Sequence, residues 1–142
     1  MKTSIFPCLW FNSNAKEAAD FYCTVFPNSK ILEENPMVVI LEINGSRFMA
    51  LNGNNQFKFN DSISFVINCE NQAEIDYYWE KLTDGGQESM CGWLKDKYGL
   101  SWQVVPTELG KLMSSKEPGK AQRVMAALLQ MRKLDLNILR EA

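Results

Sequence analysis

The sequence contains no histidine, so a metal site would have to be built from other ligands. Its four cysteines, Cys8, Cys23, Cys69 and Cys91, form no C-x-x-C pair, which argues against a zinc knuckle and a dithiol redox motif. Without histidine, a cysteine nucleophile needs a lysine, a carboxylate or a helix N-terminus to form its thiolate. No such signal lies beside Cys8 or Cys91. We therefore expect the four cysteines to be buried or idle thiols.

An excess of charge of either sign is also absent. The 142 residues have a formal net charge of −2 and a pI of about 5.2, and the Lys and Arg residues are scattered among acids. This pattern argues against nucleic acid and an anionic membrane as partners. No stretch reaches the roughly 18 apolar residues of a membrane span, and the start, MKTSIFPCLWF, has no small-residue cleavage site. We therefore expect a cytoplasmic protein.

The chain is rich in apolar residues, and two of its stretches follow the same pattern. Hydrophobic residues make up 46% of it, enough for one packed domain or for two half-domains that share a core. CLWFNSNAKEAADFY (8–22) and SFVINCENQAEIDYYWEKL (64–82) each pass from an apolar strand-like run into an N-x-x-E capping box. These boxes are Asn14 with Glu17 and Asn71 with Glu74. The repeated order of strand, cap and helix indicates an internal duplication.

Each predicted helix carries an apolar stripe and is followed by a hairpin. The stripes consist of Ala18, Phe21, Tyr22 and Val25 in the first helix and of Ile75, Tyr78, Trp79 and Leu82 in the second. Pro27 stops the first helix, and Gly85-Gly86 ends the second. The first hairpin joins MVVILEI to SRFMALN through Asn44-Gly45, and the second joins ESMCGWL to LSWQVVP through residues 96–99. KILEE, residues 30–34, supplies an extra strand in the first half.

Beyond Pro106 the pattern becomes helical. GKAQRVMAALLQM has one apolar stripe, and LDLNILREA forms a last short helix. We therefore expect a single domain made of two half-modules, at about residues 1–55 and 60–106, followed by a C-terminal helical tail at about 107–142. The tail is expected to serve packing or subunit contact.

Three segments together carry a family resemblance. LWFNSNAKEAADFYCTVFPNSKI, FMALNG and CGWLKDKYGLSWQVVP resemble the PhnB-like branch of the vicinal oxygen chelate superfamily, which includes glyoxalases and bleomycin-resistance proteins. The resemblance spans essentially the entire chain. It implies an α+β fold of duplicated βαβββ modules, which form a curved mixed sheet around a cleft, in a homodimer. Members of this branch often carry the domain name 3-demethylubiquinone-9 3-methyltransferase.

The resemblance also identifies the positions that would hold a metal. Enzymes of the superfamily typically bind a divalent metal with His, Glu or Gln from the strands of both modules. Gln103 stands where a segment of the form D-P-x-G-N-x-x-E delivers its glutamate, and Met49 is the corresponding residue of the first half. The first strands are expected to begin near residues 5–6 and 62–63, which are apolar or hydroxyl residues. Because one amide cannot replace the hydration shell of a hard cation, we predict no metal and no cofactor.

The candidate ligand-binding residues are Gln103, Trp10, Phe48, Asn52 and Trp93. The Gln103 amide offers a donor and an acceptor, and the tryptophans either line a pocket for a flat or apolar ligand or pack in the core. Asn52 is either a polar pocket contact or a turn residue at a strand end. If GLSWQVVP is a strand, Trp102 and Gln103 point to opposite faces, and we place Trp102 in the core.

Three functions are compatible with these residues. The first is a metal-free, small-molecule-binding homodimer of unassigned activity. The second is a metal-independent enzyme, for which Lys95, Asp96 and Lys97 could supply acid–base groups, although a charged run at a turn is typical of solvated surface. The third is the methyltransferase of the domain name, although no G-x-G turn follows a strand and opens a helix. The sequence alone leaves these alternatives open.

Overall fold

The computed structural model describes all 142 residues and divides into two compact units, residues 1–59 and 60–142. The first unit contains β1 (Cys8–Asn12), α1 (Ala15–Val25), β2 (Lys30–Glu34), β3 (Val38–Ile43) and β4 (Ser46–Gly53). The second contains β5 (Ser64–Cys69), α2 (Gln72–Thr83), β6 (Gln87–Glu88), β7 (Trp93–Lys95), β8 (Ser101–Pro106), α3 (Leu109–Met113), α4 (Lys120–Leu128) and α5 (Leu136–Glu141).

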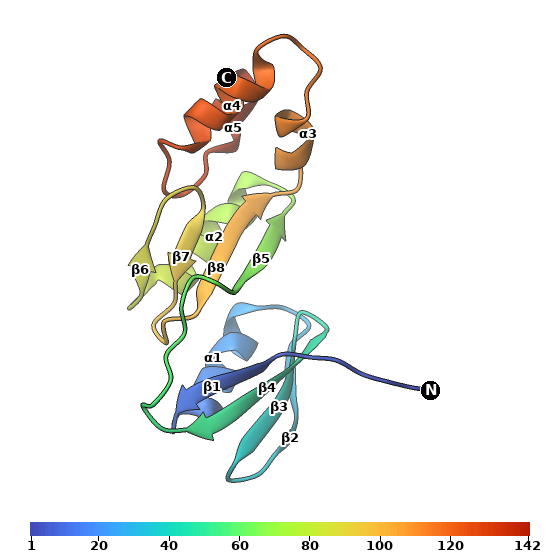
Figure 1. Ribbon diagram of the computed structural model, residues 1–142, viewed down its shortest axis with the longest axis vertical. Coiled ribbons are helices and arrows are strands. Elements are labelled where there is room, and N and C mark those ends of the chain that lie inside the picture. The colour runs from blue at the N-terminus through green and yellow to red at the C-terminus, as the bar shows by residue number, and fades with distance from the viewer. The chain divides into compact units, whose positions relative to one another are not determined.

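The two sheets have the same topology. Their strand orders are β1-β4-β3-β2 and β5-β8-β7-β6. In each sheet the two strands at one edge, β1 with β4 or β5 with β8, are parallel, and the other neighbours are antiparallel. One helix covers one face of each sheet, α1 in the first unit and α2 in the second (Figure 1). The predicted duplicated βαβββ fold with C-terminal helices is therefore confirmed.

Alternation along the strands places the core of each unit between its sheet and its helix. In the first unit, Leu9, Phe11 and Ala50 are buried on the face toward α1, and so is Phe48. From the predicted helix stripes, Ala18, Tyr22, Val25, Ile75, Trp79 and Leu82 are buried. Phe21 and Tyr78 are only half-buried, because they lie at the margins of the two stripes.

The two helix caps differ from the predicted capping boxes. In α2, Asn71 Oδ1 accepts from Glu74 N at 3.0 Å as predicted, but the Glu74 carboxylate accepts from Glu70 N at 2.8 Å. In α1 the prediction is wrong, since the Asn14 side chain makes no cap hydrogen bond. Asn14 has ψ 33°, whereas Asn71 has the extended backbone (ψ 174°) that aims a cap oxygen at the helix amides. Instead, Asn52 Oδ1 accepts from Ala15 N at 2.9 Å.

The strand boundaries also need correction. The first strand of the first unit begins at Cys8, not near residues 5–6, whereas that of the second unit begins at Ser64, next to the predicted residues 62–63. The ESMCGWL stretch does not form one strand but splits into β6 and β7, separated by a turn in which Cys91 and Gly92 adopt φ values of 62° and 84°. The second sheet therefore has four strands, as the duplicated βαβββ fold predicts, and its short strand β6 lies at the start of this stretch. With two residues, β6 is too short to show an alternating pattern.

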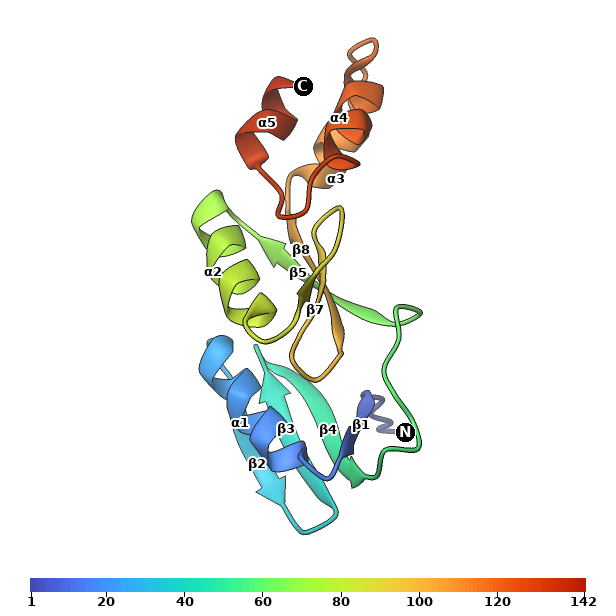
Figure 2. The same ribbon diagram turned by 90° about the vertical axis from the view of Figure 1, so that its left-hand side faces the viewer.

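The C-terminal segment, residues 107–142, belongs to the second compact unit. Its helices α3, α4 and α5 lie beyond the end of β8 that leads into them (Figures 1 and 2). They surround a small core of Val124, Leu134 and Leu139, all fully buried. No helix of the chain has the length and apolar composition needed to cross a bilayer.

Candidate functional site

The face of the second sheet opposite α2 carries a set of polar and aromatic side chains. We call it the open face of the second sheet, and it is formed by Ser64 and Val66 of β5, Trp93 and Lys95 of β7, and Ser101 and Gln103 of β8. These residues share a face because side chains alternate along each strand and paired residues point the same way. Val66 is 54% exposed, so no other part of the second unit covers the middle of this face completely.

Gln103 lies at the centre of the open face. Its cross-strand neighbours are Val66 on β5 and Trp93 on β7. The Gln103 amide nitrogen donates to Ser64 Oγ at 2.9 Å, which fixes the orientation of the amide. Trp102 lies on the other face, is 3% exposed, and donates from Nε1 to Asp96 Oδ2 at 2.9 Å. The structure therefore has Trp102 in the core, with Gln103 on the opposite face of β8.

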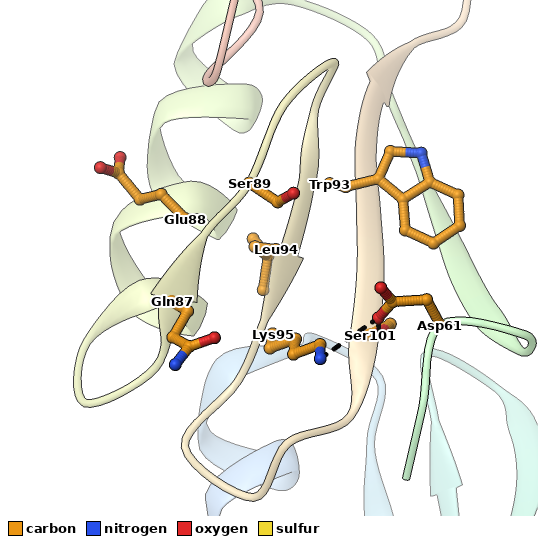
Figure 3. A pocket seen from close by; sticks show the side chains of 8 residues that line it. All are labelled: Asp61, Gln87, Glu88, Ser89, Trp93, Leu94, Lys95 and Ser101. Carbon is orange, nitrogen blue, oxygen red and sulfur yellow. Dashed lines mark hydrogen bonds and ion pairs between the residues drawn. The ribbon is translucent and has the colours of Figure 1, made fainter.

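A small polar pocket adjoins Trp93 on this side of the second unit. Lys95 Nζ lies 3.4 Å from Asp61 Oδ1, and Ser101 Oγ donates to the same oxygen at 3.0 Å. Figure 3 shows Lys95 and Asp61 pointing toward each other, with the ring of Trp93 beside them. The pocket has a volume of about 170 Å³ and is lined by Asp61, Gln87, Glu88, Ser89, Trp93, Leu94, Lys95 and Ser101.

The size and chemistry of this pocket limit what it can hold. Drug-sized ligands occupy pockets of roughly 300–1,000 Å³, so about 170 Å³ accommodates one polar group of a ligand rather than a whole molecule. The pocket offers a carboxylate, an ammonium group and a hydroxyl within hydrogen-bonding reach of one another. Sequence reasoning missed Asp61, Ser64 and Ser101 and assigned Lys95 to solvated surface. Because side chains alternate along a strand, the sequence alone could have placed Ser101 on the same face as Gln103. Only the pairing of β7 with β8 shows that Lys95 lies next to Ser101.

Of the five predicted ligand-binding residues, only Gln103 and Trp93 lie side by side in one sheet. Trp10, in the first unit, donates from Nε1 to Asn54 O at 2.9 Å, and its ring meets that of Phe57 edge-on at 5.0 Å. Its ring also lies close to Gly53, where an added Cβ would come within 2.1 Å of it. Trp10 therefore anchors the segment that follows β4.

The other two predicted residues have structural contacts within the first unit. Phe48 is 7% exposed and packs on the face of β4 toward α1. Asn52 Oδ1 caps α1, and Asn52 Nδ2 donates to Pro36 O at 3.1 Å. The Asn52 amide thus ties the end of β4 to the start of α1 and to the segment before β3.

The four cysteines are free. Cys69 is fully buried, and burial raises the pKa of its thiol to about 12. Cys69 is therefore a neutral thiol at physiological pH, and its place between the second sheet and α2 is that of a small apolar residue.

The residues at the family's metal positions do not fit a divalent cation. Met49 pairs with Cys8 in the first unit, and Gln103 pairs with Val66 in the second, so each lies on the face of its sheet that the helix does not cover. Neither supplies a charged oxygen or an imidazole. No group of three or more Cys, Asp and Glu side chains in the chain is arranged to hold a metal ion. A hard cation needs several such oxygen or nitrogen donors around it.

Comparison with known proteins places this geometry in a family. The family model for 3-demethylubiquinone-9 3-methyltransferase matches residues 3–105. A putative 3-demethylubiquinone-9 3-methyltransferase, PhnB protein, from Bacillus cereus is 31% identical with a TM-score of 0.67, and the match covers 74% of this chain and 100% of that chain. No curated protein matches the sequence.

More distant solved structures share the fold. A glyoxalase-related enzyme from Fulvimarina pelagi is 14% identical with a TM-score of 0.54, covering 76% of this chain and 91% of its own. The fosfomycin resistance protein FosX from Listeria monocytogenes, solved with Mn(II) and sulfate, is 15% identical with a TM-score of 0.54, covering 73% of this chain and 89% of its own. The chain belongs to the 3-demethylubiquinone-9 3-methyltransferase family, the PhnB-like branch of the vicinal oxygen chelate superfamily.

Proposed function

We propose that this PhnB-like protein binds a small, partly aromatic molecule on the open face of its second sheet, without a metal. The observation that carries the proposal is the direct pairing of Gln103 with Trp93 beside the pocket of Asp61, Lys95 and Ser101. An aromatic ring and an oriented amide next to a small polar pocket are the usual components of a small-molecule site.

Each group has a distinct part in the proposed binding. The half-exposed Trp93 ring offers a flat surface for stacking, which favours a ligand with an aromatic portion. Gln103 donates its N–H to Ser64, so its carbonyl oxygen is the atom available to accept from a ligand. Lys95 and Ser101 supply donors, and Asp61 supplies an acceptor, for one polar substituent in the pocket.

To test the proposal, the small molecules that co-purify with the native protein are identified by mass spectrometry. Gln103→Ala and Trp93→Ala should each lower the amount of the retained compound by about fivefold or more, because each loses a contact of about 1 kcal/mol. Gln122→Ala, at an exposed glutamine of α4 outside this face, is the matched control and should retain it fully. Equal retention by all three variants would contradict the proposed site.

A second candidate function is a metal-independent enzyme at the same site. It is favoured by the contact of the Ser101 hydroxyl and the Lys95 ammonium group with one oxygen of Asp61, since these groups can pass protons among themselves. Turnover of the retained compound, followed by its mass change, would distinguish this function from binding alone.

The methyltransferase activity of the family name is a third candidate. The glycines with positive φ lie in turns and caps, and no G-x-G turn follows a strand and opens a helix. Saturable binding of S-adenosylmethionine, measured by calorimetry, would favour the methyltransferase.

The proposal includes a homodimer in the cytoplasm. Leu129 and Ile138, on the C-terminal segment, are 54% and 52% exposed, and a two-fold contact would remove such surface from water. Four free cysteines in one chain are typical of a reducing compartment.

A further inference from the structure

The C-terminal segment lies outside the family match, which ends at residue 105. Within the second unit this segment nevertheless contacts the β6–β7 hairpin that carries part of the pocket. The contact is made by residues 131–136, which connect α4 to α5 and which we call the strap. Figures 1 and 2 both show the turn between β6 and β7 reaching toward this connection.

The strap is hydrogen-bonded to the hairpin turn through the backbone. Cys91 N donates to Met131 O at 2.7 Å, and Gly92 N donates to Arg132 O at 2.9 Å. Gly92 also fits closely between β8 and the strap, because an added Cβ would lie 2.8 Å from Val104 O and 3.2 Å from the Leu134 side chain. Since Leu134 is fully buried, the turn is packed as well as hydrogen-bonded.

The other side of the strap is anchored on α2. Gln72 Nε2 donates to Leu134 O at 2.9 Å, and Gln72 Oε1 accepts from Leu136 N at 2.8 Å. Lys133 Nζ lies 2.8 Å from Asp76 Oδ1 on the next turn of the helix. A single glutamine therefore holds two backbone groups of the strap, and an exposed ion pair adds to this anchor.

On its β7 side the hairpin is held by β8, through three residue pairs and a hydrogen bond from Val104 N to Gly92 O at 2.7 Å, but its β6 side has little else to hold it. β6 is an edge strand that pairs with β7 through only two residue pairs, Gln87 with Lys95 and Glu88 with Leu94. Trp93 follows Gly92 directly in the chain, so the strap contact lies one residue from the ring that lines the pocket.

A further contact joins the strap to β6. The Glu88 carboxylate accepts from Trp79 Nε1 at 2.6 Å and lies 3.9 Å from the Arg132 guanidinium. The pocket residues of β6 and β7 are therefore placed by the strap as well as by the sheet. A short edge hairpin without such support would open locally at low cost.

We propose that the strap positions the pocket wall formed by β6 and β7, and that Gln72 is the positioning residue that holds the strap on α2. Gln72 acts on Trp93 and Lys95 through residues 131–136 and does not line the pocket. Loosening the strap changes the mobility of this wall while the β5–β8 pair and α2 stay folded.

The experiment is amide hydrogen exchange by NMR on the full-length chain without any ligand. In Gln72→Ala, the Cys91 and Gly92 amides should exchange about tenfold faster, as expected from the loss of both side-chain hydrogen bonds to the strap. The Trp93 indole resonance should shift, and the β5 amides should change less than about twofold. Gln122→Ala, at an exposed glutamine of α4, is the matched control and should leave all these amides unchanged.

A second variant covers the case in which Gln72→Ala does not fold. Lys133→Ala removes only the exposed ion pair with Asp76 and should accelerate exchange of the same two amides about twofold. Unchanged Cys91 and Gly92 exchange, or equal acceleration throughout β5, would overturn the proposal. Because the readout needs no ligand, it can succeed or fail independently of the proposed binding function.

Discussion

Gln103 and Trp93 are cross-strand partners on β8 and β7, on the face of the second sheet that α2 does not cover. The neighbouring residue Trp102 pairs with Leu94 and faces the core. Along this one strand, residues that stabilise the fold alternate with residues of the proposed binding face. This separation makes the two faces independently testable.

Substitution on the two faces of β8 should have opposite effects. Trp102→Ala should lower the free energy of unfolding by about 3–5 kcal/mol, because it leaves a cavity and removes the indole bond to Asp96. Gln103→Ala should change it by less than about 1 kcal/mol, since its hydrogen bond to Ser64 lies on a half-exposed face. Urea denaturation followed by circular dichroism measures both. A stable Trp102→Ala protein together with an unstable Gln103→Ala protein would show that Gln103, and not Trp102, faces the core.

No tightly bound transition metal should accompany the purified protein. The residues at the equivalent positions, Met49 and Gln103, provide one thioether and one amide, and neither belongs to a cluster of metal-binding side chains. Elemental analysis of protein purified without an affinity tag should find less than about 0.1 equivalent of zinc, nickel, manganese or iron, as expected for a site without charged oxygen or imidazole ligands. A stoichiometric content would show that carboxylates outside these positions bind the ion.

The duplication could be predicted from the sequence because strand, cap and stripe recur at fixed spacing. Local patterns of this kind are set by residues close in the chain, and the two helices and most strands follow them. The errors occurred where a distant residue decides the structure. Asn52 replaces Asn14 as the cap of α1, and the turn at Cys91 and Gly92 is held by strap residues about 40 positions away.

The candidate site was only partly predictable for the same reason. Gln103 was found from its position in a family motif and Trp93 from its place in the same segment. Asp61 and Ser101 are separated by 40 residues, so their contact depends on the parallel pairing of β5 with β8. Lys95 lies in a charged run whose local pattern is that of a solvated turn, and the pairing of β7 with β8 places it next to Ser101 in the pocket.

The protein should be a dimer in solution. Light scattering at micromolar concentration should give twice the chain mass of 16.2 kDa. Leu129→Lys places a charge on exposed apolar surface of the C-terminal segment and should shift the population toward the monomer. Met37→Lys, at an exposed methionine of the first unit, is the control and should not. A monomer that persists as the wild-type protein is concentrated would remove the dimer from the proposed function.

The cysteines should differ in their reactivity toward iodoacetamide. Thiolate is the reactive form, and the Cys69 thiol, with its pKa raised to about 12 by burial, remains protonated at pH 8. Cys8, which is exposed, should be alkylated at least tenfold faster, as expected from accessibility alone. Because the pKa of this thiol is higher in the folded protein than in the unfolded chain, its contribution to stability is fully present below the pKa of the unfolded chain. This contribution should be lost as the pH rises toward 12. Peptide mass spectrometry at timed intervals measures the rates, and rapid labelling of Cys69 in folded protein would contradict its buried position.

The two asparagines at the start of α1 should respond to substitution in opposite ways. Asn52 Oδ1 accepts from Ala15 N, and Asn52 Nδ2 donates to Pro36 O, so Asn52→Ala should lower the free energy of unfolding by about 1–2 kcal/mol. Asn52→Asp keeps the capping oxygen beside the positive end of the helix dipole and should recover part of this loss. Asn14 Oδ1 is buried without a hydrogen-bond partner, so Asn14→Ala removes an unsatisfied acceptor. It should therefore be neutral or stabilising by up to about 1 kcal/mol. Urea denaturation of the three variants tests the assignment, and a large loss in Asn14→Ala with none in Asn52→Ala would restore the cap that the local sequence predicts.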